Sequence, residues 1–161
     1  MGASYTALEA LPQPWEGHEG VAVLDDAQLT ALVAAAGLAR RQAYAPYSGF
    51  AVGAAAVSAD GRVFLGCNVE NASYGLSMCA ERNALAAAVA GGAQQLVAIV
   101  IVSDAVEPST PCGACRQWMA ELGSKNMEVV AANLNGEVHR YELERLFPHP
   151  FRLGNKKQPE P

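Results

Sequence analysis

Residues 77–90 read Ser-Met-Cys-Ala-Glu-Arg-Asn-Ala-Leu-Ala-Ala-Ala-Val-Ala, and this stretch predicts a helix of small apolar residues that ends at Gly91-Gly92. Cys79 and Glu81 lie at its start. A second stretch, residues 110–117, reads Thr-Pro-Cys-Gly-Ala-Cys-Arg-Gln and predicts another helix start. Together the two stretches place three thiols and one carboxylate where helices begin. We expect these four groups to carry the chemistry.

The composition is that of one globular domain with a large core. The chain has 161 residues, of which 51% are apolar and 17% are charged. Its longest apolar runs fall short of the roughly 20 residues that span a bilayer, and no signal-peptide pattern is present. We therefore expect a cytoplasmic protein with no membrane partner. The net charge of −5 argues against nucleic acid as a partner, because protein surfaces that bind nucleic acid carry excess Lys and Arg.

The order of predicted elements indicates an α/β fold with a mixed five-stranded sheet and helices on its faces. The run of residues 96–102 is rich in Val and Ile and suits a central strand covered on both faces. Asp60-Gly61 and Asn135-Gly136 are expected to supply the positive backbone angles of two tight hairpins. The predicted helices cover residues 25–44, 79–90, 112–122 and 142–147, and the predicted strands cover residues 50–57, 62–69, 96–102, 128–134 and 137–141.

Three segments are expected along the chain. Residues 1–24 lack sustained periodicity and predict a poorly ordered or loosely packed arm. Residues 25–153 contain all the predicted elements and form the domain. Residues 154–161 are polar and predict a disordered tail. Gly37 disfavours an unbroken first helix, which Pro46 is expected to end.

Three cysteines have the spacing and the local positions of a zinc site. Two residues separate Cys112 from Cys115, so both thiolates can reach one zinc ion from a single turn. A thiol at a helix N-terminus also faces unpaired N–H groups, which favour the thiolate form, and Cys79 has the same position in its own helix. If the two helices start side by side, three thiolates converge and leave the fourth position for water. Such an open site is typical of catalytic zinc.

Charged residues beside the cysteines suggest how such a site would work. Glu81 lies two residues after Cys79, where it could take a proton from zinc-bound water and deliver it to a substrate. Three thiolates outweigh the two positive charges of zinc. We therefore expect Arg82 and Arg116 to donate hydrogen bonds to the sulfur atoms.

Other readings of the cysteines remain open on spacing alone. A lone Cys-x-x-Cys also suits a redox pair or half of a structural zinc site. Joined to Cys-Ala-Glu, however, it matches the zinc deaminase signature, which permits three cysteines. Cys67 could be a fourth ligand, which would make the site structural, but its position in a strand-like run favours a small buried hydrophobe. His18, His139 and His149 fit no His-x-Glu pattern and are expected at the surface.

Four motifs together resemble the small cytidine deaminases, specifically the homotetrameric branch that uses three cysteines, and the similarity covers about Asp25 to Phe151. The resemblance implies a three-layer α/β/α fold and one zinc ion per subunit. It also implies hydrolysis of cytidine and deoxycytidine to uridine and deoxyuridine with release of ammonia, a step of pyrimidine salvage. The motifs are Tyr-Ala-Pro-Tyr-Ser-Gly-Phe-Ala-Val-Gly-Ala-Ala at 44–55, Gly-Cys-Asn-Val-Glu-Asn-Ala at 66–72, Cys-Ala-Glu-Arg at 79–82 and Pro-Cys-Gly-Ala-Cys-Arg-Gln at 111–117.

The same resemblance assigns the site residues. It places zinc on the three cysteines, with Glu81 as the proton shuttle. Asn68 and Glu70 match the pair that binds the ribose hydroxyl, and their spacing at a strand end points them the same way. Phe50 matches an aromatic side chain that packs on the pyrimidine, and Ala80 matches a backbone contact to the base. The zinc ligands are Cys79, Cys112 and Cys115.

The resemblance also bears on assembly and on competing functions. Phe151 is expected to reach the site of a neighbouring subunit, and Tyr47 to lie near a subunit contact. One alternative is a deaminase of a cytosine nucleoside analogue or antibiotic such as blasticidin S, or of a polynucleotide, although Asn68 and Glu70 favour a free nucleoside. A non-catalytic zinc-binding module is the other alternative, and the intact Glu81 argues against it.

Overall fold

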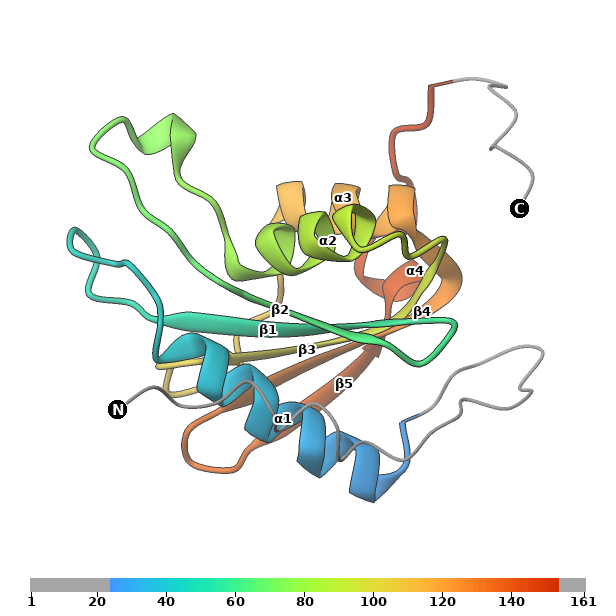
Figure 1. The fold of residues 1–161 in the computed structure, drawn as a ribbon, viewed down its shortest axis with the longest axis horizontal. Helices are drawn as coiled ribbons and strands as arrows, with labels where there is room; N and C mark the ends of the chain where they lie inside the picture. Colours follow the sequence, from blue (N-terminus) through green and yellow to red (C-terminus); the bar gives the residue numbers. More distant parts are fainter. Residues whose placement is uncertain (1–23, 154–161) are drawn as a thin grey trace.

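The computed structural model describes residues 24–153, which form a sheet between two helical layers (Figure 1). The expectations for residues 1–23 and for the tail at 154–161 fall outside this part of the chain. The helices are α1 (Asp26–Arg40), α2 (Ala80–Ala90), α3 (Gly113–Leu122), α4 (Leu143–Leu146) and the 3₁₀ helix η2 (Tyr74–Leu76), and the strands are β1 (Val52–Ser58), β2 (Val63–Cys67), β3 (Leu96–Ser103), β4 (Gly123–Asn133) and β5 (Val138–Glu142).

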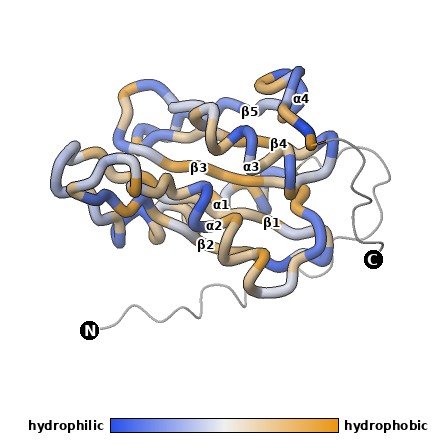
Figure 2. Tube along the Cα trace, turned by 90° about the horizontal axis from the view of Figure 1, so that it is seen from above, coloured by the Kyte–Doolittle hydropathy of each residue, from blue (hydrophilic) through white to orange (hydrophobic). Residues whose placement is uncertain are grey.

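The sheet is mixed and five-stranded, as predicted. Its order is β2-β1-β3-β4-β5, with β3 and β4 parallel and the other neighbours antiparallel. All eight residues of β3 are buried. Figure 2 shows this strand as hydrophobic along most of its length. A continuous apolar strand needs cover on both faces, which explains the position of β3 at the centre.

Helices cover both faces of the sheet, which confirms the three-layer α/β/α arrangement. α1 packs on one face around Leu32 and Ala36, whereas α2, α3 and α4 pack on the other (Figure 1). Small residues bring α2 close to the sheet. A Cβ atom at Gly66 of β2 would lie 2.4 Å from both the Ala80 carbonyl oxygen and the Ala84 nitrogen. The start of α2 is therefore fixed against β2 by direct backbone contact.

The first helix is shorter than predicted but unbroken. α1 continues through Gly37 and ends at Arg40, four residues before the expected end. Asp25 caps it by accepting a hydrogen bond from the Gln28 nitrogen at 2.8 Å. Tyr44 leaves the helical path because its backbone pairs with the segment after β2, donating to the Asn68 oxygen at 3.0 Å. This backbone pairing with the segment after β2 takes the place of helix at Tyr44.

The two hairpins differ from the prediction in their backbone angles. Gly61 and Gly136 have φ values of 83° and 86°. Among the described residues, positive φ values occur at glycines alone. Asp60 and Asn135 therefore do not adopt the left-handed conformation that a two-residue turn of the expected type requires. The loops instead use one glycine each, as longer hairpin loops with a bulge do.

The bounds of β4 and of the domain's first residue also differ from the prediction. β4 begins at Gly123, five residues earlier than expected, with an irregularity in its pairing to β3 before Ala98. Leu24, assigned to the arm, belongs to the domain because it is only 1% exposed. Its nitrogen donates to Glu128 at 2.8 Å and its carbonyl oxygen accepts from Arg140 at 2.6 Å. Within residues 24–153, every helix is too short or too polar to cross a bilayer.

Candidate metal and catalytic site

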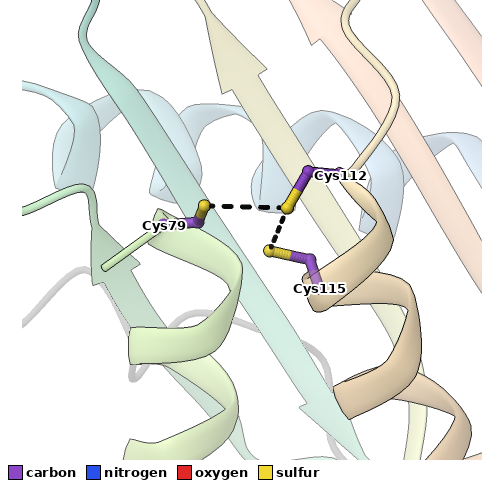
Figure 3. Close-up of side chains that lie close together, drawn as sticks. All are labelled: Cys79, Cys112 and Cys115. Atoms are coloured by element: carbon purple, nitrogen blue, oxygen red, sulfur yellow. Dashed lines mark hydrogen bonds between the residues drawn. The ribbon is translucent and has the colours of Figure 1, made fainter. Parts of the chain in front are cut away.

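Three sulfur atoms meet where α2 and α3 begin. Cys79 and Cys112 are the N-cap residues of these helices, and Cys115 lies in the first turn of α3. The Cys112 sulfur is 3.5 Å from that of Cys115 and 3.9 Å from that of Cys79. Figure 3 shows the three side chains pointing toward one another from the two helix starts. All three sulfur atoms lie within 4.8 Å of one another, so they can hold one metal ion.

The electrostatics of this cluster favour thiolate at Cys79. Hydrogen bonding from Cys115 and, to a smaller extent, from Arg82 lowers the pKa of Cys79 to about 5 despite partial burial. The same hydrogen bond raises the pKa of Cys115, which keeps the proton that Cys79 lacks. A metal ion must displace that proton, because zinc binds thiolates.

Glu81 is buried in the first turn of α2. Glu81 is only 5% exposed, and this burial raises the pKa of its carboxyl group above the ordinary value. The negative charge of Cys79 acts in the same direction. A carboxyl group shielded from water in this way can bind and release a proton nearer to neutral pH than an exposed one.

The two arginines that follow the cysteines have different partners. Arg82 donates to the Cys79 sulfur at 3.8 Å and to the Ser77 carbonyl oxygen at 3.0 Å. Arg116 does not make the sulfur contact that we expected. It donates instead to the carbonyl oxygens of Pro111 at 2.7 Å and Leu146 at 2.9 Å. These carbonyl groups precede α3 and end α4, so Arg116 joins two backbone segments.

Cys67 lies apart from the sulfur cluster. The metal-binding group found among the described residues contains the other three cysteines and not this one. Cys67 is the last residue of β2 and is half-buried rather than fully buried. Its sulfur atom donates a hydrogen bond to the Gln42 carbonyl oxygen at 3.4 Å. A fourth thiolate ligand therefore has no support in this part of the chain.

Asn68 and Glu70 both bind the segment that leads into the first residue of β1. Asn68 Oδ1 accepts from the Val52 nitrogen at 2.8 Å, and its Nδ2 donates to the Phe50 carbonyl oxygen at 2.8 Å. Glu70 accepts from the Tyr47 nitrogen at 2.9 Å and from the hydroxyl group of Ser48. The bond from Ser48 contributes most to lowering the pKa of Glu70. Both side chains therefore organise this segment by hydrogen bonds.

The other predicted contact residues differ in exposure. The side chain of Phe50 is accessible, with 37% of the residue exposed, and Tyr47 is exposed beside Tyr74. Ala80 is completely buried at the start of α2. Phe151 is 68% exposed, yet its backbone is fixed by two hydrogen bonds with the Gln117 side chain, at 2.9 and 3.1 Å.

Residues 26–131 match the family model described as the cytidine and deoxycytidylate deaminase zinc-binding region. The chain belongs to the cytidine deaminase family. A crystal structure of the cytidine deaminase from Burkholderia pseudomallei is 53% identical, covers 76% of this chain and 98% of that one, and has a TM-score of 0.73. A crystal structure of the Mycobacterium tuberculosis cytidine deaminase is 40% identical, with 80% and 100% coverage and a TM-score of 0.68.

A curated cytidine deaminase from Halalkalibacterium halodurans is 50% identical over 113 residues, which are 70% of this chain and 86% of that protein. Membership of the cytidine deaminase family confirms the resemblance seen in the motifs and identifies the protein as a zinc-dependent hydrolase. The sulfur cluster fits this metal, because three thiol donors within 4.8 Å suit tetrahedral zinc and leave one position open.

Sequence reasoning missed the contacts of two residues, Gln117 and Asp104. Gln117 lies inside the second cysteine motif but received no role, although it fixes Phe151. Asp104 follows the central strand and binds the Ala51 nitrogen and Arg40. The sequence signal for Asp104 is a polar residue directly after a buried strand. No nearby sequence pattern identifies its partners, Arg40 and Ala51.

Proposed function

We propose that the protein hydrolyses cytidine and deoxycytidine at C4 of the base. Water supplies the oxygen that forms the new bond to C4, the bond between C4 and the exocyclic nitrogen breaks, and ammonia leaves with uridine or deoxyuridine as the other product. One observation carries the proposal: Glu81 is buried in the first turn of the helix whose N-cap, Cys79, belongs to the three-sulfur cluster.

Each site residue has a distinct task in this reaction. We assign zinc binding to Cys79, Cys112 and Cys115. The metal, when bound, lowers the pKa of a water molecule toward neutrality. Glu81 would accept one proton from the attacking water and deliver it to N3 of the base, and would then carry a second proton from the new hydroxyl group at C4 to the departing amine. Its raised pKa supports this exchange, because the carboxyl group must be both base and acid within one turnover.

A free nucleoside is the substrate class that the surroundings of the site favour. We assign the ribose hydroxyl to Asn68 and Glu70, the face of the pyrimidine to Phe50 and a backbone contact to Ala80. The accessible ring of Phe50 supports its assignment. A polynucleotide is less suitable, since the net charge of −5 repels phosphate groups.

We also propose that the protein is a cytoplasmic homotetramer. Phe151 supports this assembly because its ring is exposed while its backbone is held by Gln117. A fixed and exposed aromatic side chain is suited to insertion into a neighbouring subunit. The Phe151 ring would contact the active site of that subunit.

Ammonia release provides the direct test of substrate class. The zinc-loaded protein is incubated separately with cytidine, deoxycytidine, blasticidin S and a cytosine-containing single-stranded oligonucleotide, and the products are identified by chromatography. We expect ammonia with uridine or deoxyuridine from the two nucleosides. Release from the antibiotic or the oligonucleotide alone would contradict the proposed substrates, and release from none would favour a non-catalytic zinc-binding module.

A further inference from the structure

The segment of residues 50–52 is held from both sides by side chains at the point where strand pairing ends. β1 pairs with β2 as far as Gly53 and with β3 as far as Val52. Beyond these residues, the first residue after each neighbouring strand supplies a side chain. These residues are Asn68 after β2 and Asp104 after β3. The segment thus lies between two polar side chains instead of two strands.

Asn68 holds the segment on the β2 side. Its side chain binds the Val52 nitrogen and the Phe50 carbonyl oxygen, each at 2.8 Å. Its own backbone nitrogen donates to the Val52 carbonyl oxygen at 3.1 Å. These bonds fix the backbone on both sides of Ala51.

Asp104 holds the segment on the β3 side. Its Oδ2 accepts from the Ala51 nitrogen at 3.3 Å, and its Oδ1 forms an ion pair with Arg40 of α1. The two side chains are 29% and 19% exposed, so the pair is partly shielded from water. A hydrogen bond with an ionised partner is stronger than a neutral one.

Arg40 reaches Asp104 because α1 lies directly on β1. A Cβ atom at Gly53 would lie 2.0 Å from the Ala36 carbonyl oxygen and 2.4 Å from the Arg40 nitrogen. The end of α1 is therefore set against the start of β1 by backbone contact. Asp104, directly after β3, thus connects Arg40 of α1 to Ala51, the residue that follows Phe50 and precedes β1.

We propose that Asp104, held by Arg40, is a positioning residue for the Phe50 ring. This rests on the proposed function, because it assumes that Phe50 packs on the pyrimidine. Asp104 acts through the backbone of Ala51 and does not touch the substrate. A segment that is already ordered binds at lower entropic cost. Without the carboxylate, the substrate would have to order the segment itself.

The kinetic test compares Asp104→Ala and Asp104→Asn with Asp60→Ala. Asp60 is the matched control, since it too pairs with an arginine, Arg62, but lies in the turn between β1 and β2. Losing a charge-assisted hydrogen bond should raise the KM of Asp104→Ala for cytidine about tenfold, with kcat within about twofold of the parent. Asp104→Asn should regain part of the affinity because its oxygen can accept from Ala51. Asp60→Ala should match the parent.

Amide hydrogen exchange supplies a readout that does not depend on turnover. Residues 50–52 should exchange faster in Asp104→Ala than in the parent or in Asp60→Ala. If the parent fails to deaminate cytidine, the proposed function falls, while the exchange rates still decide whether Asp104 fixes the segment. Unchanged KM with unchanged exchange would overturn the positioning role. A loss of kcat and zinc with unaltered KM would overturn it as well.

Discussion

The sulfur atoms of Cys79 and Cys112 lie 3.9 Å apart although the two residues belong to different helices. Each is the N-cap of its helix, so the contact forms only when α2 and α3 begin at the same place above the sheet. The metal site is thus a product of tertiary packing. Binding of zinc is expected to stabilise the arrangement that creates the site.

Zinc removal should therefore destabilise the fold. Chelation is expected to lower the melting temperature by about 5 to 10 °C, the size of effect that follows from losing a ligand present well above its Kd. Thermal unfolding followed by circular dichroism, before chelation and after zinc is added back, measures the change. Cys67→Ala is the control, because Cys67 lies outside the cluster and should leave the response intact. Identical melting temperatures with and without zinc would contradict the expectation.

Replacing the two arginines beside the cysteines should affect different properties, zinc retention for Arg82 and stability for Arg116. Arg82 contacts the Cys79 sulfur, so Arg82→Ala should release zinc to a chelator about tenfold faster, as loss of a ligand's hydrogen-bond partner does. Arg116 binds two carbonyl oxygens, so Arg116→Ala should lower the free energy of unfolding by about 2 kcal/mol with a smaller effect on zinc. Zinc release and chemical denaturation measure the two effects. Equal zinc loss in both variants would argue against this division.

Gln117 should influence substrate binding through Phe151. Gln117→Ala removes the two hydrogen bonds that hold the Phe151 backbone, and its KM for cytidine should rise about fivefold while zinc content is unchanged. Phe151→Ala should raise KM by a similar or larger factor. If Gln117 acts through Phe151, the double variant should be no worse than Phe151→Ala alone. Additive effects would show that Gln117 has an independent role.

Gly53 of β1 and Gly37 of α1 should respond oppositely to replacement by alanine. Gly53→Ala places a Cβ atom 2.0 Å from the Ala36 carbonyl oxygen and should lower the free energy of unfolding by about 3 kcal/mol. Gly37 of α1 has no atom within 4 Å of such a Cβ, so Gly37→Ala should raise the free energy of unfolding by up to about 1 kcal/mol. Urea denaturation of both variants measures the difference. Destabilisation by Gly37→Ala would contradict the expectation that a Cβ atom fits at this position without a clash.

Local patterns predicted those parts of the fold that depend on few residues. Cys79 and Cys112 were expected where helices begin, a position that favours thiolate, and the structure has both there. The apolar run from Leu96 identified the central strand, because only burial on both faces suits seven consecutive apolar residues.

Features that arise where separate elements meet were not predictable in this way. The end of α1 at Arg40 depends on Tyr44 pairing beyond β2, and the early start of β4 depends on Gly123 pairing with Leu96. Arg116 was expected at sulfur because it adjoins Cys115 in sequence. Its carbonyl partner at Leu146 is 30 residues away, and no spacing rule shows that α4 ends there.

The most direct test of the account is the loss of ultraviolet absorbance when cytidine is added to the zinc-loaded parent and to zinc-loaded Glu81→Gln. The amide keeps the size of the side chain but cannot carry the proton, so the parent should consume cytidine while the variant loses several orders of magnitude in turnover with its zinc retained. Turnover in the variant close to that of the parent would contradict the assignment of Glu81 as the proton carrier.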